Sequence, residues 1–218
     1  MSEEYIYVVI SETCTGFAKA IRKFGKIKYN HAAISFDPDF NEIYSFTRDQ
    51  YNIPVVGGLN RENISRYTLD KYDLDIKVFK VPVTAEQKQT IHRQVLEIAD
   101  DPEFQYNLYS VIFWPLFKGF KTYKAYTCVE FVAHLLENTD VVLDKKPHKY
   151  YPQDMDYVLK QYEIYSGSML NYRNFERKTD GFYFEKFSWW KILKESVPVL
   201  LILAERDFGT LCKSIVSN

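Results

Sequence analysis

One amphipathic segment near the middle of the chain constrains the fold most. Residues 125–136 read AYTCVEFVAHLL. Apolar positions recur there at intervals of three and four residues, which places them on one face of an α-helix that has to be buried against a core. Thr127 is a typical N-cap residue, so Cys128 is predicted to lie in the first helical turn. The residues of the buried face are Cys128, Phe131, Val132, Leu135 and Leu136.

The rest of the chain has enough apolar residues to build such a core. It has 218 residues, of which 46% are hydrophobic and 17% are aromatic. This composition excludes a disordered chain and fits one domain, or one domain with an extension. The formal net charge is −1, so no global field points to nucleic acid as a partner.

Hydrophobic periodicity and turn residues predict an α+β order of elements. We expect a main domain over residues 1–172 and a C-terminal extension over 173–218 that packs on it. Thr84 and Gln87 form a capping box that predicts one helix start. The predicted strands cover 5–10, 31–36, 42–46, 75–83 and 162–168, the helices cover 15–24, 85–99, 127–137 and 153–161, and residues 52–60 are predicted to be a loop.

The cysteines argue against disulfide or zinc frameworks. Cys14, Cys128 and Cys212 are odd in number and widely spaced, without a CxxC pair. Free thiols fit a reducing compartment. The N-terminal sequence lacks the basic start of a signal peptide, and the apolar run 197–204 is too short to span a bilayer. We therefore expect a cytoplasmic protein without metal or cofactor.

Cys128 is a candidate nucleophile because of its place in the helix. In the first turn the backbone N–H groups have no helical partner and the helix dipole is positive, which favours a thiolate. The same N–H groups can hold an oxyanion. The alternative is a purely structural cysteine, because cysteine on an apolar helix face usually packs as a small hydrophobe.

His31 is the candidate base. It opens an apolar strand, whereas His92 and His134 fall in helix interiors and His148 lies in a basic loop. A histidine at a strand end can reach a neighbouring helix start and take a thiol proton. The alternative role for His31 is a hydrogen bond to backbone.

A third polar group should orient the imidazole of His31. A tight hairpin turn over Asp37–Asp39 would place Ser45 directly opposite His31, with Glu42 nearer the turn as the alternative. We favour Ser45, although a register slip of one residue would exchange the two faces.

Three segments in this order resemble a known superfamily. Residues 29–35 (YNHAAIS), 42–46 (EIYSF) and 126–132 (YTCVEFV) are similar to the permuted branch of the NlpC-type, papain-like cysteine peptidases. The lecithin:retinol acyltransferase-like enzymes belong to the same branch, and the chain looks especially like its small bacterial members, which are mostly uncharacterised. The resemblance covers residues 5–165 and implies a permuted papain-like fold. In that fold an antiparallel sheet packs against the N-terminal end of the cysteine-bearing helix.

The resemblance also implies roles. Cys128 would be the nucleophile, His31 the base and Ser45 the third residue, with Tyr29 and Thr127 in support. The implied function is a thiol hydrolase or acyltransferase that acts on an amide or ester of a small molecule, peptide or lipid. The acyltransferase relatives tend to have a second histidine where this chain has Ser45, so the alternative is a weak or inactive member that serves as a binding or structural protein.

Other features are weaker. Cys14 near another predicted helix start is a less favoured nucleophile. Basic residues at 19–28 and 118–124, the latter beside Trp114, Phe117 and Phe120, can mark an anionic membrane surface. The favoured interpretation is a solvated helix face and a buried aromatic cluster, so membrane contact is not favoured. The oligomeric state stays open.

Overall fold

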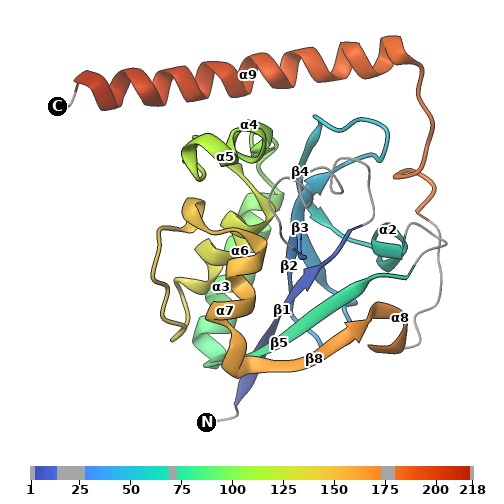
Figure 1. The fold of residues 1–218 in the computed structure, drawn as a ribbon, viewed down its shortest axis with the longest axis vertical. Coiled ribbons are helices and arrows are strands. Elements are labelled where there is room, and N and C mark those ends of the chain that lie inside the picture. The colour runs from blue at the N-terminus through green and yellow to red at the C-terminus, as the bar shows by residue number, and fades with distance from the viewer. Residues whose placement is uncertain (1–2, 14–27, 69–72, 173–179, 217–218) are drawn as a thin grey trace.

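The core of the protein is a six-stranded antiparallel sheet, which confirms the α+β class (Figure 1). The computed structural model describes residues 3–13, 28–68, 73–172 and 180–216. The strand order is β4-β3-β2-β1-β5-β8, and β6 and β7 form a separate short parallel pair. The strands are β1 (Glu4–Ser11), β2 (His31–Ser35), β3 (Ile43–Arg48), β4 (Gly57–Arg61), β5 (Asp75–Val83), β6 (Gln105–Tyr106), β7 (Ala125–Tyr126) and β8 (Glu163–Ser168).

Helices cover both faces of the sheet. Residues of α3, α6 and α7 share the larger core with Ile6, Val8 and Ile10 of β1. Tyr67 and Met169, from α2 and α8, share a smaller core with the alternate β1 residues. The helices are α2 (Ile64–Thr68), α3 (Ala85–Ala99), α4 (Leu108–Ile112), α5 (Trp114–Phe117), α6 (Cys128–Leu136), α7 (Pro152–Val158), α8 (Met169–Tyr172) and α9 (Trp189–Val216), with 3-10 turns at Pro147–Lys149 and Lys160–Tyr162.

The helix starts predicted at Thr84 and Thr127 are confirmed. Both predicted helix starts are closed by capping boxes: Thr84 with Gln87 at α3 and Thr127 with Glu130 at α6. The apolar face of α6 is buried against the sheet. The predicted helix 15–24, Cys14 and the basic residues 19–26 lie outside the described residues.

The register predicted for the hairpin is wrong by two residues. Ile34 pairs with Tyr44, so the loop is longer than a turn over Asp37–Asp39. The Asp37 carboxylate accepts hydrogen bonds from three backbone N–H groups of the loop, at Asp39, Asn41 and Glu42. Within that loop Phe40 takes a left-handed conformation with φ of 58° and stacks on Tyr172. A shift of two residues keeps the same faces, so Ser45 stays on the His31 side of the sheet.

The predicted loop 52–60 is also partly wrong, because its end forms strand β4. Gly57 and Gly58 read as loop residues in the sequence. In the structure they let the backbone of β4 lie close to the backbone at Thr47 and at Phe104. A Cβ on Gly57 would lie 2.3 Å from the Thr47 carbonyl oxygen, and one on Gly58 would lie 2.9 Å from that of Phe104. These glycines are needed for strand packing rather than for a turn.

The C-terminal residues contain the long helix α9, which crosses one end of the molecule (Figure 1). Leu203 of α9 is buried against Leu108 of α4, and the Tyr109 hydroxyl donates to the Leu200 carbonyl over 3.2 Å. Arg206 donates to the carbonyls of residues 103, 123 and 124. Within the described ranges, no helix combines the length and apolar character needed to cross a membrane.

The expected buried aromatic cluster is not buried. Phe113 and Phe117 are exposed, together with Ile112 and Leu116 on the same two short helices. Trp114 and Phe120 are half-buried, and the Trp114 ring lies tilted against Tyr151 with 4.7 Å between the ring centroids. The interpretation of this segment as a buried cluster was therefore wrong for Phe117, because α4 buries only Leu108 and Ser110 and α5 buries no residue.

Candidate functional site

His31 and Glu62 form a buried ion pair at the end of the sheet. His31 is the first residue of β2, and Glu62 directly follows β4. The Nε2 atom of His31 lies 2.9 Å from Oε1 of Glu62, and both side chains are almost fully buried. The Glu62 backbone N–H donates to the Ile43 carbonyl, which holds the residue against β3. The third group that contacts His31 is thus a carboxylate.

Two hydroxyl groups hold this carboxylate in place. Ser45 Oγ and the Tyr67 hydroxyl both donate to Oε1 of Glu62, the latter over 2.7 Å. Burial would raise the pKa of Glu62, but the charge and hydrogen bond of His31 outweigh it. The Ser45 and Tyr67 bonds add to this, so the pKa of Glu62 lies below its usual value. Glu62 is therefore a charged group whose Oε1 atom is held by three polar side chains.

Cys128 interacts with the same imidazole. Burial disfavours the charged imidazolium, but the Glu62 carboxylate and a hydrogen bond with Cys128 raise the pKa of His31 from 6.5 to about 10. Because Nε2 is engaged by Glu62, Nδ1 is the ring nitrogen left to meet the sulfur. Cysteine, histidine and carboxylate are thus joined in series, the order in which a base and its orienting group activate a nucleophile.

The start of α6 positions Cys128. Thr127 is the N-cap, and its hydroxyl accepts the Glu130 N–H over 3.2 Å while Glu130 accepts the Thr127 N–H. Cys128 is 5% exposed and begins the helix. Burial raises the pKa of Glu130 to about 8, although the Thr127 hydrogen bond opposes the shift.

Tyrosines surround the thiol. Burial raises the pKa of Tyr151 to about 12, and the nearby Cys128 charge adds to the effect. Burial and the same cysteine also raise the pKa of Tyr106. Burial and the Glu62 charge raise the pKa of Tyr67, which keeps its phenol protonated as a donor. Ser11 lies opposite His31 in β1, and its buried hydroxyl has no hydrogen-bond partner among the described residues.

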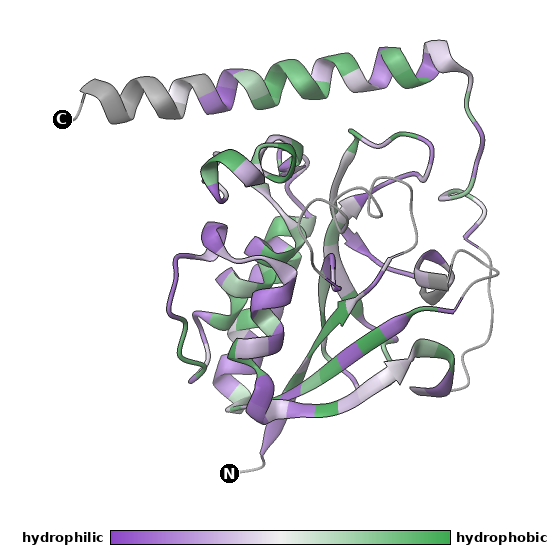
Figure 2. Cartoon of the chain, in the orientation of Figure 1, coloured by the Kyte–Doolittle hydropathy of each residue, from purple (hydrophilic) through white to green (hydrophobic). Residues whose placement is uncertain are grey.

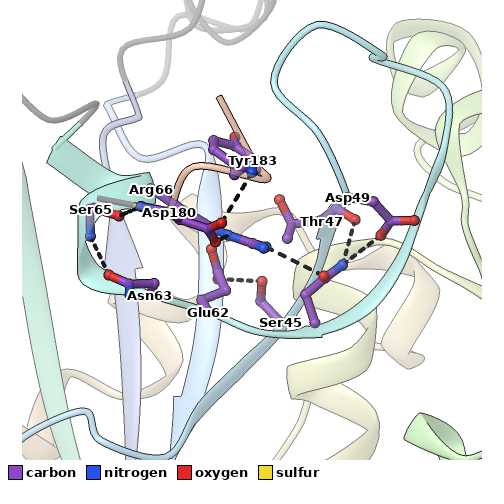
Figure 3. Close-up of polar contacts among 10 residues, drawn as sticks. Ser45, Thr47, Asp49, Glu62, Asn63, Ser65, Arg66, Asp180 and Tyr183 are labelled. Atoms are coloured by element: carbon purple, nitrogen blue, oxygen red, sulfur yellow. Dashed lines mark hydrogen bonds and ion pairs between the residues drawn. The ribbon is translucent and has the colours of Figure 1, made fainter. Parts of the chain in front are cut away.

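A second layer of polar contacts joins this region to the C-terminal residues (Figure 3). Arg66 Nε lies 2.7 Å from Oδ2 of Asp180, and its guanidinium also donates to the Asn60 side chain. Asp180 accepts the Tyr183 N–H, and the Tyr183 ring lies under the Arg66 guanidinium. Residues beyond the predicted main domain thus brace the segment that presents Glu62.

Two predicted residues lie elsewhere. Glu42, the alternative third residue, accepts hydrogen bonds from His92 over 2.8 Å and from Tyr44. Tyr29 packs in the larger core, and its backbone N–H donates to Gln153. Ser45 reaches the site through Glu62.

Sequence reasoning missed Glu62. It lies in the polar run Asn60–Asn63 behind a segment assigned to a loop. Only recognition of β4 as a strand beside β3 could have pointed to it, since Glu62 then falls at the strand end next to Ile43.

Comparison with known proteins adds no identity, since no family model, curated protein or solved structure matches the chain. In the parts of the chain described here, no three His, Cys, Asp or Glu side chains gather as metal ligands would. The functional interpretation therefore depends on the geometry of the site.

Proposed function

We propose that the protein is a cysteine-nucleophile hydrolase or acyltransferase with the triad Cys128, His31 and Glu62. The observation that supports this proposal is the buried imidazole that interacts with a thiol on one side and a fixed carboxylate on the other. We further propose that the sheet and α6 form the permuted papain-like arrangement that the sequence resembles.

The first half-reaction would be acylation. The Cys128 sulfur, its proton held by His31, attacks the carbonyl carbon of an amide or ester, and the carbonyl π electrons move to the oxygen. The capping box uses the N–H groups of Thr127 and Glu130, which leaves those of Cys128 and Val129 to stabilise the oxyanion. Collapse breaks the bond to the amine or alcohol, which takes the proton from His31 and leaves a thioester.

The second half-reaction would release the acyl group. His31 removes a proton from water or from another acceptor, whose oxygen or nitrogen attacks the thioester carbonyl. The carbon–sulfur bond breaks and the thiol is regenerated. Throughout, Glu62 fixes the ring orientation and stabilises the imidazolium, while Ser45 and Tyr67 hold Glu62.

The weak or inactive alternative was motivated by a serine in the third position. The contact of the Glu62 carboxylate with His31 argues against this alternative, because a charged acceptor orients an imidazole more strongly than a hydroxyl does.

The test is covalent trapping. The wild-type protein is incubated with p-nitrophenyl acetate and with iodoacetamide across pH 5–9, and the modified cysteine is mapped by peptide mass. We expect acetylation and rapid alkylation at Cys128, with both lost in Cys128→Ser and slowed about 100-fold or more in His31→Ala. Cys14→Ser is the control and should react like wild type. An unreactive Cys128 in folded wild-type protein would contradict the proposal.

A further inference from the structure

Exposed apolar side chains gather on α4 and α5. Ile112 ends α4, Phe113 joins α4 to α5, and Leu116 and Phe117 lie on α5, where Leu116 is 73% exposed. Single exposed apolar residues are ordinary on protein surfaces, but a contiguous group of large ones marks a contact site. The group lies on two adjoining short helices.

Helix α9 carries a second exposed apolar stripe. Its inner side packs through Ser196 and Leu203. The stripe on its outer flank repeats at i, i+3, i+7 and i+11, so it runs continuously along the helix. The stripe begins with a stacked pair of exposed tryptophans, Trp189 and Trp190, at 3.7 Å between ring centroids. The stripe residues are Trp190, Leu193, Val197 and Leu201.

Both groups lie at one end of the molecule. Helix α9 runs over α4 and α5 in Figure 1, and Tyr109 of α4 contacts Leu200 directly. Figure 2 shows apolar residues along both α9 and the short helices beneath it. We call this end, defined by α4, α5 and residues 186–201, the apolar end.

Positive charges outnumber negative ones at the apolar end, where residues 186–201 contain three lysines and one glutamate. Residues 104–129 and 186–194 contain no aspartate or glutamate, in a chain with 29 of them. The charge of Lys124 is compensated by ion pairs with Asp101 and Glu103. Glu195, the residue after the second segment, lies 3.9 Å from Lys191. The other lysines in the two segments are Lys118, Lys121, Lys186, Lys191 and Lys194.

We propose that the apolar end docks on an anionic bilayer surface. Tryptophan, phenylalanine and leucine side chains would enter the headgroup region, and the lysines beside them would meet anionic phosphates. A second copy of the chain fits less well, because a symmetric contact through this end would bring identical lysines together. The proposal is independent of the thiol chemistry.

The test is co-sedimentation of the full chain with vesicles. One set is phosphatidylcholine alone, and the other contains about one-third phosphatidylserine. We expect binding at least about ten-fold stronger to the anionic vesicles, weakened by salt, with a blue shift of tryptophan emission. Cys128→Ser should bind equally well, which separates this outcome from failure of the proposed function.

Variants locate the surface. Leu116→Ser with Phe117→Ser, Trp190→Ser with Leu193→Ser, and Lys118→Glu with Lys121→Glu should each weaken binding about ten-fold or more. Tyr157→Ser on α7, an exposed aromatic outside the apolar end, is the control and should bind like wild type. Circular dichroism and melting temperature verify that each variant is folded.

Two results would overturn the proposal. One is binding that is absent or indifferent to phosphatidylserine and to these variants. The other is a concentration-dependent dimer in sedimentation velocity that Trp190→Ser with Leu193→Ser dissociates, with no vesicle binding by the wild type, which would assign the surface to a second copy.

Discussion

At the scale of single residues, one oxygen atom of Glu62 organises the candidate site. His31, Ser45 and Tyr67 all contact Oε1. A buried carboxylate is costly unless it is paired and hydrogen-bonded, and here both conditions are met. The raised pKa of His31, about 10, is due to Glu62 and Cys128 acting against burial. The pair therefore stabilises the fold below the ordinary pKa of histidine and loses this contribution as the pH rises through about 10.

Glu62→Gln should slow the chemistry of Cys128 without removing the side chain. The amide cannot stabilise an imidazolium as the carboxylate does, so iodoacetamide alkylation at pH 7 should fall about ten-fold or more. Glu42→Gln is the matched control, because that carboxylate binds His92 instead. Equal alkylation rates in wild type and Glu62→Gln would refute the role of Glu62.

Glu130 predicts a pH-dependent stability. Its pKa of about 8 lies above the usual 4.5, because of burial, so the folded state holds a proton that the unfolded state releases between these values. Stability from this group therefore falls as pH rises from about 4.5 through 8. Glu130→Gln keeps the capping box and removes the titration. Urea unfolding at pH 5 and pH 9 should show the variant gaining up to about 4 kcal/mol relative to wild type.

The control for this experiment is Glu137→Gln, an exposed carboxylate at the other end of α6 that contacts His134. The unfolding free energy of Glu137→Gln should depend on pH in the same way as that of the wild type between pH 5 and pH 9. Parallel stability curves for wild type and Glu130→Gln would mean that Glu130 ionises normally.

At the scale of elements, the first turn of α6 and the pairing of β3 with β4 place the three reacting side chains. The capping box fixes the direction of the first helical N–H groups beside Cys128. Strand β4 carries Glu62 to the same end of the sheet. Each element is held by a local feature that a single substitution can remove.

Thr127→Ala should remove the hydroxyl of the α6 cap. Loss of an N-cap typically costs about 1 kcal/mol of unfolding free energy, and the alkylation rate of Cys128 should fall with it. Thr127→Ser restores the hydroxyl and should recover both quantities. If Thr127→Ser behaves like Thr127→Ala, the packing of the threonine methyl group matters rather than the cap.

Gly57→Ala should destabilise the protein because the new Cβ would lie 2.3 Å from the Thr47 carbonyl oxygen. The nearest atoms all belong to the backbone of Thr47 and Arg48, which leaves little freedom to relax, so we expect a loss of about 2 kcal/mol or more in urea unfolding. Gly181→Ala is the matched control, since its Cβ would meet nothing within 4 Å. If Gly57→Ala lost as little unfolding free energy as Gly181→Ala, β3 and β4 would be able to move apart at little cost.

At the scale of the whole molecule, the C-terminal residues are linked to the site region as well as to α4. Asp180 binds Arg66, four residues beyond Glu62, while α9 packs on Leu108 further along the chain. The ion pair is mostly buried, which makes it stronger than a surface pair. Residues after 180 therefore belong to the structural support of the candidate site.

A double-mutant cycle on Arg66→Ala and Asp180→Ala should show this coupling. We expect an interaction energy of about 1–3 kcal/mol by urea unfolding. The exposed pair Lys191 and Glu195, four residues apart on α9, is the control and should couple by less than about 0.5 kcal/mol. Coupling of Arg66 and Asp180 no larger than the control would mean that the extension docks without this contact.

The sequence by itself determined what local periodicity and capping control. The helix at Cys128, its Thr127 cap and the opening of a strand at His31 follow from a few neighbouring residues. Only the tertiary structure decided which distant groups meet. Glu62 reaches His31 because the glycines of β4 let that strand lie beside β3. Phe113 and Phe117 stay exposed because the short helices there leave one side to solvent. Contacts between distant segments depend on packing geometry, which no local pattern encodes.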